Sequence, residues 1–211
     1  MNTLDYFVAK YKIDLRQPSP ILLPAVDRME MALAMTDLGF TNGAEVGTAA
    51  GDHALLLCQN IPNLTLYCVD PWEQVDGFIS FKNSKLSEWH NQAVDKLSVF
   101  PSCHLVQMIS MDAVKEVQDK SLDFVYIDGA HDFRHVSEDI SEWIKKIKPG
   151  GILYGHDYVT IPYGRYACHV KDVVDAYCRS HWIPHWFMLG NLEQRADGKY
   201  ARIPNWMFVV E

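Results

Sequence analysis

Paired cysteines are absent from this sequence. Its five cysteines are scattered, no two form a Cys-x-x-Cys pair, and most lie in apolar stretches. In a chain of 211 residues, an odd and scattered set indicates reduced, buried thiols rather than a disulfide framework. We therefore expect a cytoplasmic protein.

Basic runs and long apolar runs are also missing. Asp and Glu outnumber Lys and Arg by 27 to 19, for a formal charge of −8, and no Lys/Arg run supplies a basic face, which argues against a nucleic-acid partner. No apolar run is long enough to span a bilayer. Met1 is followed by Asn-Thr-Leu-Asp-Tyr, so we expect neither a secretory signal nor a membrane partner.

Alternating strand-like and helix-like segments fill the chain from residue 43 onward, and no repeat or linker divides it. We expect parallel strands at 43–47, 64–70, 104–109, 122–128 and 151–157, with helices between them. Two aromatic runs, 185–189 and 206–210, are joined by a polar stretch containing Asp197-Gly198, which is typical of an antiparallel hairpin. The prediction is a single α/β domain, 1–211, with a doubly wound, Rossmann-like sheet of seven strands.

An extension, residues 1–40, precedes the first of these strands. Val26, Met29 and Leu33 recur at helical spacing after Pro24, which predicts a helix over 24–38 that Gly39 closes. A later helix is expected to end in the lysines before Pro149-Gly150-Gly151.

Acids follow the ends of three apolar runs, at Asp70, Asp128 and Asp157, and Glu45 lies near the end of a fourth run. Because the carboxyl ends of parallel strands share one edge of a sheet, we expect these acids to meet where ligands bind. Gly47 and Gly51 bracket the first strand-to-helix turn with a G-x-x-x-G spacing, which is neither a dinucleotide fingerprint nor a P-loop. The spacing therefore favours a nucleoside cofactor whose attached group is not a phosphate.

Residues 44–158 resemble the class I S-adenosylmethionine-dependent methyltransferases, in which an E-x-G-x-x-x-G loop and an acid after the second strand hold the cofactor. The resemblance implies S-adenosylmethionine as cofactor and Asp70 as its ribose ligand. The other residues that it implies around the cofactor are Glu45, Gly47, Thr48, Gly51, Met111, Asp112 and Asp128.

Two further signatures, Ile127-Asp-Gly-Ala-His131 and Gly155-His-Asp-Tyr158, end strands that should be neighbours. They resemble the methyltransferase-24 type and, more distantly, the catechol-type metal-dependent O-methyltransferases. That resemblance implies Asp128, Asp157 and His156 as ligands of Mg²⁺ or another divalent metal, although His156 stands where the catechol pattern has an acid. Whether the ion is Mg²⁺, a softer metal or absent stays open, and in the metal-free alternative His131 or His156 acts as general base beside Asp128.

Other interpretations of these residues compete with catalysis. His131-Asp-Phe-Arg-His135 resembles the H-E-x-x-H of zinc proteases, but His131 should precede the helix and Asp is shorter than Glu. Asp128 or Asp132 can instead cap the next helix.

We predict methyl transfer from S-adenosylmethionine to a hydroxyl of a small molecule. The alternatives are a metal-dependent hydrolase and a non-catalytic S-adenosylmethionine-binding protein. Aromatic segments at both ends allow a homo-oligomer. Side chains of two long connections are expected near the acceptor: Trp72, Phe78, Phe81, Tyr163, Arg165 and Tyr166.

Overall fold

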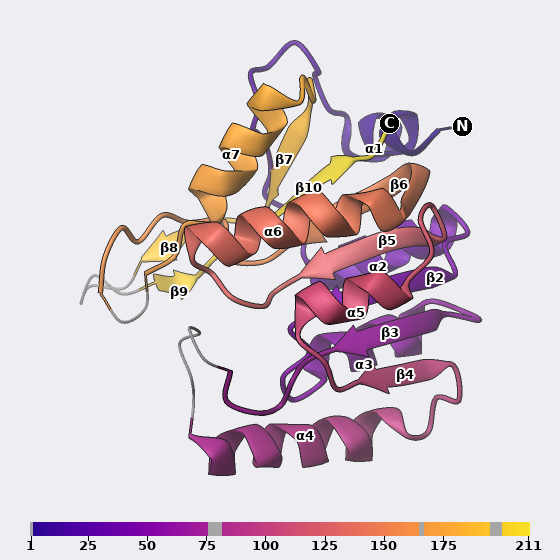
Figure 1. Cartoon of the computed structure of the whole chain (residues 1–211). Coiled ribbons are helices and arrows are strands. Elements are labelled where there is room, and N and C mark those ends of the chain that lie inside the picture. The colour runs from indigo at the N-terminus through magenta and orange to yellow at the C-terminus, as the bar shows by residue number, and fades with distance from the viewer. Residues whose placement is uncertain (1, 76–81, 165–166, 195–199) are drawn as a thin grey trace.

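A mixed β-sheet forms the centre of this computed structural model, which describes residues 2–75, 82–164, 167–194 and 200–211 (Figure 1). Its strands are β1 (Ile21–Leu23), β2 (Asn42–Val46), β3 (Thr65–Val69), β4 (Cys103–Val106), β5 (Leu122–Ile127), β6 (Ile147–Gly155), β7 (Trp186–Leu189) and β10 (Asn205–Val209). Within the described ranges they lie in the order β1-β7-β10-β6-β5-β2-β3-β4. A separate ribbon pairs β8 (Glu193–Gln194) with β9 (Tyr200–Arg202).

The pairing confirms a doubly wound α/β fold. Strands β2 to β6 are parallel to one another, and β10 lies between β6 and β7 and runs antiparallel to both. The predicted count of seven strands is wrong, because the short β1 adds a parallel edge strand beside β7. Three residues are too few to show a strand period in the sequence. The predicted Asp197-Gly198 turn lies outside the described residues.

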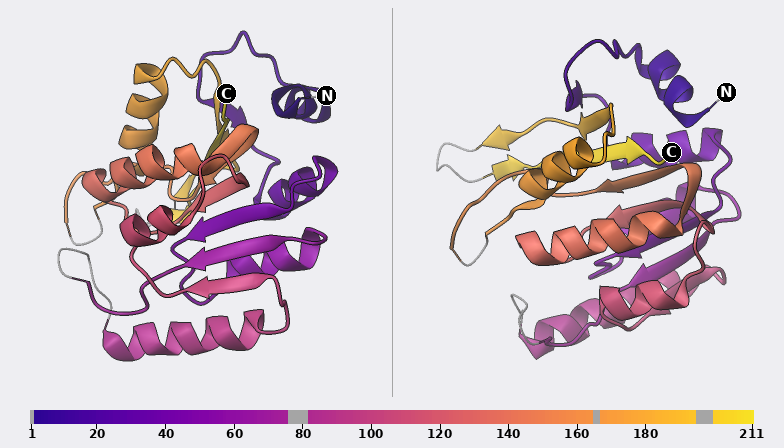
Figure 2. Two further views of the ribbon diagram at one scale, coloured as in Figure 1. Left: turned by 45° about the vertical axis from the view of Figure 1, so that its right-hand side comes forward. Right: turned by 45° about the horizontal axis from the view of Figure 1, so that its top comes forward.

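Helices cover both faces of the sheet (Figure 2). They are α1 (Thr3–Tyr11), α2 (Arg28–Asp37), α3 (Asp52–Asn60), α4 (Asn83–Leu97), α5 (Ser110–Glu116), α6 (Phe133–Trp143) and α7 (Val170–Ser180). One buried cluster joins residues of α1 to α4 to the sheet, and a second joins residues of α5 to α7 to the opposite face. The sheet therefore separates two cores.

Two predicted helix boundaries are wrong. The helix expected over 24–38 begins only at Arg28, because the Asp27 side chain accepts a hydrogen bond from the Glu30 amide and caps it. The helix expected to reach Pro149 ends at Trp143 and continues as one 3₁₀ turn, Ile144–Lys146. Strand β6 then runs through Pro149 and Gly150, and the Gly150 amide donates to the Val210 carbonyl.

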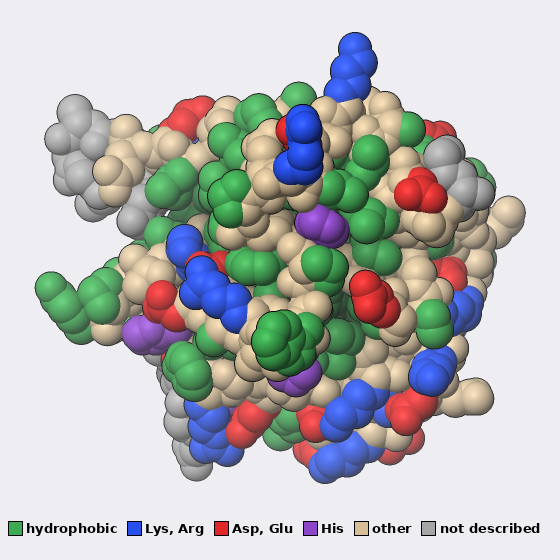
Figure 3. Space-filling model, turned by 90° about the horizontal axis from the view of Figure 1, so that it is seen from above, with side chains coloured by type: hydrophobic (Ala, Val, Ile, Leu, Met, Phe, Trp, Pro, Cys, Tyr) green, Lys and Arg blue, Asp and Glu red, His purple; other side chains and the backbone are tan. Residues whose placement is uncertain are grey.

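All five cysteines are free, and Cys68, Cys168 and Cys178 are buried. Among the described residues, no helix combines the length and apolar character needed to cross a membrane. On the face seen from the top of Figure 1, acidic and basic side chains are interspersed among hydrophobic ones (Figure 3).

Candidate functional site

The carboxyl ends of the parallel strands form one edge of the sheet, toward which the arrowheads of β3, β4 and β5 point in Figure 1. Asp70 follows β3, Asp128 follows β5, and Asp157 follows β6. Strands β5 and β6 are neighbours, with Ile127 opposite Gly155, so Asp128 and Asp157 come together as expected.

A cavity of about 590 Å³ opens at this edge, and we call it the edge cavity. It extends from the loop after β2, past Asp70, to the β5–α6 loop and the first turns of α6. Of the predicted site residues, its walls include Gly47, Asp70, Met111, Asp128 and His131. A concave site at the strand ends of an α/β sheet is the usual place for a small-molecule ligand.

Asp70 contacts the glycine loop directly and lies on the same wall of the cavity. Its Oδ2 accepts a hydrogen bond of 2.9 Å from the Ala49 amide, and its Oδ1 accepts one of 2.8 Å from the Trp72 amide. The Trp72 indole in turn donates to the Ala49 carbonyl over 2.8 Å, so Trp72 is buried against the loop. Burial raises the pKa of Asp70. Each carboxylate oxygen keeps a free lone pair with which it can accept a further donor.

Gly47 has a φ of +91° and lies directly against the β5–α6 loop. A Cβ atom placed on Gly47 would be 2.2 Å from the Asp128 carbonyl oxygen and 2.6 Å from the Gly129 nitrogen. The Asp128 amide also donates to the Val46 carbonyl over 2.7 Å. Glycine is thus required for the backbone that ends β2 to touch the backbone that carries Asp128.

Glu45, which the resemblance placed around the cofactor, is not among the described residues that line the edge cavity. Successive strand residues face opposite sides of a sheet, so Val46 lines the cavity whereas Glu45 points toward α3. Glu45 is 2% exposed, and its Oε1 lies 2.9 Å from Nδ1 of His53. Burial raises the pKa of Glu45 well above its ordinary value and lowers that of His53 to about 3, so the His53 imidazole is neutral near pH 7.

Three other predicted cofactor residues are also absent from the described cavity wall. Thr48 is buried, and Gly51 faces α4, where a Cβ atom would lie 3.2 Å from the Ala93 Cα. The exposed Asp112 pairs with Lys115 over 2.8 Å. Two of the aromatic candidates are described, the buried Trp72 and the exposed Tyr163, whereas Phe78, Phe81, Arg165 and Tyr166 lie outside the described residues.

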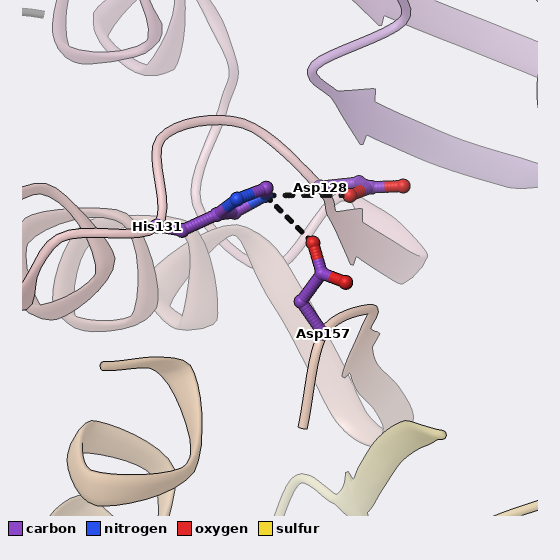
Figure 4. A group of neighbouring side chains, drawn as sticks. All are labelled: Asp128, His131 and Asp157. Carbon is purple, nitrogen blue, oxygen red and sulfur yellow. Dashed lines mark ion pairs between the residues drawn. The ribbon is translucent and has the colours of Figure 1, made fainter. Parts of the chain in front are cut away.

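His131 lies between the carboxylates of Asp128 and Asp157 (Figure 4). Its Nε2 is 3.0 Å from Oδ2 of Asp157 and 3.6 Å from Oδ1 of Asp128. The Asp128 contact is too long for a hydrogen bond and the Asp157 contact lacks hydrogen-bond geometry, so this buried nitrogen has no hydrogen-bond partner among the described residues. Burial lowers the pKa of His131, but the two carboxylates outweigh burial and raise it above its ordinary value.

The second oxygen of each carboxylate, the one that does not face His131, contacts another basic side chain. Arg28, the first residue of α2, places Nη2 3.2 Å from Oδ2 of Asp128. His156 places Nδ1 3.0 Å from Oδ1 of Asp157. Burial raises the pKa of Asp157, but the two neighbouring imidazoles dominate and hold it below its usual range. The arrangement directs one oxygen of each carboxylate toward His131.

A metal ion fits this group better through His131 than through the predicted His156. Ligand atoms of Asp128, His131 and Asp157 lie within 4.8 Å of one another, and His156 does not belong to this group among the described residues. One imidazole and two carboxylates suit Mn²⁺, Fe²⁺ or Zn²⁺ as well as Mg²⁺.

The zinc-protease pattern does not form in this structure. His131 lies before α6 and His135 lies within it, so the two imidazoles are not on one helical face. Asp132 instead caps α6 by accepting hydrogen bonds from the Arg134 and His135 amides.

Two residues of this edge were missed in the sequence. Arg28 contacts Asp128 across 100 positions of chain, a separation for which no local pattern gives a signal. Asp139 lines the cavity and is 4% exposed. The sequence does contain a signal for Asp139, because helical spacing places this acid on the apolar side of α6, between Val136 and Trp143.

A family model described as a methyltransferase domain, Methyltransf_24, matches residues 44–158. An uncharacterized protein of Sinorhizobium fredii (strain NBRC 101917 / NGR234), y4gI, is 28% identical over 120 residues, a match that covers 54% of this chain and 12% of that protein.

Solved structures share the fold at low identity. An O-methyltransferase from Bacillus cereus in complex with SAH gives a TM-score of 0.61 at 16% identity, covering 99% of this chain and 89% of that one. The O-methyltransferase TomG from Streptomyces achromogenes, involved in tomaymycin synthesis and in complex with SAM, gives 0.60 at 15% identity with the same coverage.

Proposed function

The chain belongs to the Methyltransf_24 family of methyltransferase domains, and on that premise we propose that it transfers a methyl group from S-adenosylmethionine to a hydroxyl oxygen of a small molecule. The observation that carries the proposal is the continuity of the edge cavity. One wall has the Gly47 loop and Asp70, and the same cavity reaches Asp128 and His131. A donor bound along it would bring its sulfonium end toward the residues that can activate an acceptor.

In the proposed mechanism, Asp70 accepts hydrogen bonds from the ribose hydroxyls of the donor. The acceptor hydroxyl gives its proton to the imidazole of His131, and its oxygen attacks the methyl carbon. The carbon–sulfur bond breaks, and its electron pair stays on sulfur as S-adenosylhomocysteine. Alignment of oxygen, carbon and sulfur supplies much of the rate, and the carboxylates of Asp128 and Asp157 stabilise the imidazolium that forms.

A divalent metal is the alternative means of activating the hydroxyl. Asp128, His131 and Asp157 would hold it, and when bound it would lower the pKa of the acceptor hydroxyl. Arg28 pairs with Asp128, and the two carboxylates raise the pKa of His131, so cationic side chains of the protein can balance the carboxylate charge without an ion.

For that reason, we expect treatment with a chelator, followed by its removal, to change the transfer rate less than about twofold. The rate is measured as S-adenosylhomocysteine release before treatment and after addition of Mg²⁺ or Mn²⁺. A large loss that Mn²⁺ restores, and that is absent in Asp157→Asn, would assign the metal mechanism instead.

Donor binding is the direct test of the proposed function. Calorimetric titration of the protein with S-adenosylhomocysteine should show binding, and Asp70→Asn should weaken it by about 10- to 100-fold, since hydrogen bonds to a charged group contribute roughly 1.5–3 kcal/mol. Asp52→Asn is the matched control, because Asp52 is exposed and pairs with Lys96 outside the cavity wall. Absence of binding by the unaltered protein at millimolar ligand would refute the proposal.

The acceptor class is found by screening. Phenols, sugars and hydroxy acids are incubated with protein and donor, and S-adenosylhomocysteine release is followed. Tight donor binding with no transfer across the panel would favour a binding protein, and ester hydrolysis without donor would favour a metal-dependent hydrolase.

A further inference from the structure

Asp139 is a buried acid that the proposed mechanism does not use. It lies on α6 among apolar residues, is 4% exposed, and still lines the edge cavity. Burial raises its pKa to about 7. Burying a carboxyl group on the apolar side of a helix costs free energy unless the group is hydrogen-bonded. The hydrogen bonds of Asp139 therefore indicate why it is there.

The hydrogen bonds around Asp139 have a fixed direction. The Trp143 indole N–H, which can only donate, donates to Ser110 Oγ over 2.8 Å. The Ser110 hydroxyl therefore gives its own proton to Oδ1 of Asp139. Ser110 is the sole hydrogen-bond donor to this carboxyl group in the described part of the chain, which leaves Oδ2 as an acceptor.

The free oxygen lies at the β5–α6 loop. A Cβ atom placed on Gly129 would be 3.8 Å from Oδ2 of Asp139 and 3.6 Å from a methyl carbon of Val46. Both Gly129 and Val46 line the edge cavity. Oδ2 is therefore beside the cavity wall rather than deep within the core under α6.

Charge and shape along the cavity indicate what this oxygen faces. The methyl-transfer end lies at Asp128 and the ribose ligand is Asp70, so the purine lies beyond Asp70. The residues next to Asp70 and at the start of α5 are mainly apolar: Val69, Pro71, Met108, Ile109 and Met111. Ser110 and Asp139 are among the polar residues that line the same cavity. Asp112, which the resemblance placed around the cofactor, is exposed and pairs with Lys115.

We propose that Asp139, oriented by Ser110 and Trp143, accepts a hydrogen bond from the 6-amino group of the donor's adenine and rejects a 6-oxo purine. The inference rests on the proposed function, since it assumes S-adenosylmethionine in the edge cavity. A 6-oxo group would bring its acceptor oxygen against the Asp139 acceptor and leave both unpaired, which is the arrangement that gives strong discrimination.

The test compares S-adenosylhomocysteine with S-inosylhomocysteine, its 6-oxo counterpart, by calorimetry at pH 8.5, where the Asp139 carboxyl is ionised. The unaltered protein should bind the adenine compound about 10- to 100-fold more tightly. In Asp139→Asn the Ser110 proton still meets the side-chain oxygen, so the amide N–H₂ faces the cavity. This donor matches a 6-oxo group and opposes a 6-amino group, so the preference should reverse.

Asp112→Asn is the matched control and should keep the original preference. If the unaltered protein binds neither compound, the proposed function fails. If it binds S-adenosylhomocysteine but Asp139→Asn keeps the original preference, Asp139 only supports Ser110 and Trp143, and this inference is overturned. Should Asp139→Asn not fold, Ser110→Ala frees the carboxyl to rotate and should reduce the preference, whereas an unchanged preference would again overturn it.

Discussion

Replacing His131 by glutamine should slow methyl transfer by about 100- to 10,000-fold, the range that a positioned general base contributes. Glutamine preserves polarity but cannot take up the acceptor's proton. The substitution should lower kcat and leave the affinity for the donor unchanged. His131 acts on the acceptor hydroxyl, whereas donor affinity is set mainly at Asp70. The measurement is the initial rate of S-adenosylhomocysteine release with an acceptor found by screening, together with calorimetric donor affinity.

His181→Gln is the matched control, since His181 is exposed at the end of α7 and stacks on Tyr177. It should retain the full rate. A His131→Gln variant that transfers methyl groups within about threefold of the unaltered rate would remove His131 from the mechanism and leave alignment alone to account for catalysis.

Alanine at Gly47 is the substitution expected to damage the fold most. Its Cβ would meet the Asp128 carbonyl oxygen at 2.2 Å, and a backbone atom cannot rotate away as a side chain can. Gly150→Ala is the matched control, because Gly150 has a similar φ of +83° with nothing within 4 Å of a Cβ. Comparing the two variants separates the cost of a positive φ, which both share, from the cost of the steric clash, which only Gly47→Ala has.

We expect Gly47→Ala to lower the free energy of unfolding by about 1–3 kcal/mol more than Gly150→Ala does, since overpacking a well-packed site costs roughly that amount. Gly150→Ala alone carries the cost of the unfavourable φ, of order 1–3 kcal/mol. Denaturant unfolding monitored by circular dichroism measures both. Equal losses of unfolding free energy in the two variants would mean that the loop after β2 and the β5–α6 loop can move apart, and that their contact is not tight.

Positions at strand ends were the most predictable part of the site. Asp70, Asp128 and Asp157 were found because a carboxylate after an apolar run has a known place in a parallel sheet. Glu45 lies in the core because successive strand residues face opposite sides of the sheet, a local pattern that the sequence already contains.

Other features depend on contacts that no sequence window contains. Arg28 reaches Asp128 only because α2 packs near the carboxyl end of the sheet. The start of β6 resembled a helix end because lysines and Pro149-Gly150 are typical of one, yet Ile147 pairs with Leu122 and the tertiary pairing prevails. The choice of His131 over His156 likewise depends on how each imidazole is turned.

The position of β10 has a consequence for the order of assembly. Strands β2 to β5 and the helices between them come from one continuous stretch, so the half of the sheet that carries Asp70 and Asp128 can form from neighbouring segments. Strands β6 and β7 become joined only when β10 pairs with both, with Trp206 opposite Gly155 on one side and Met188 on the other. The pairing of β10 with β6 closes a long stretch of chain, which is entropically slow, so β2 to β6 should gain protection from hydrogen exchange before β7 and β10.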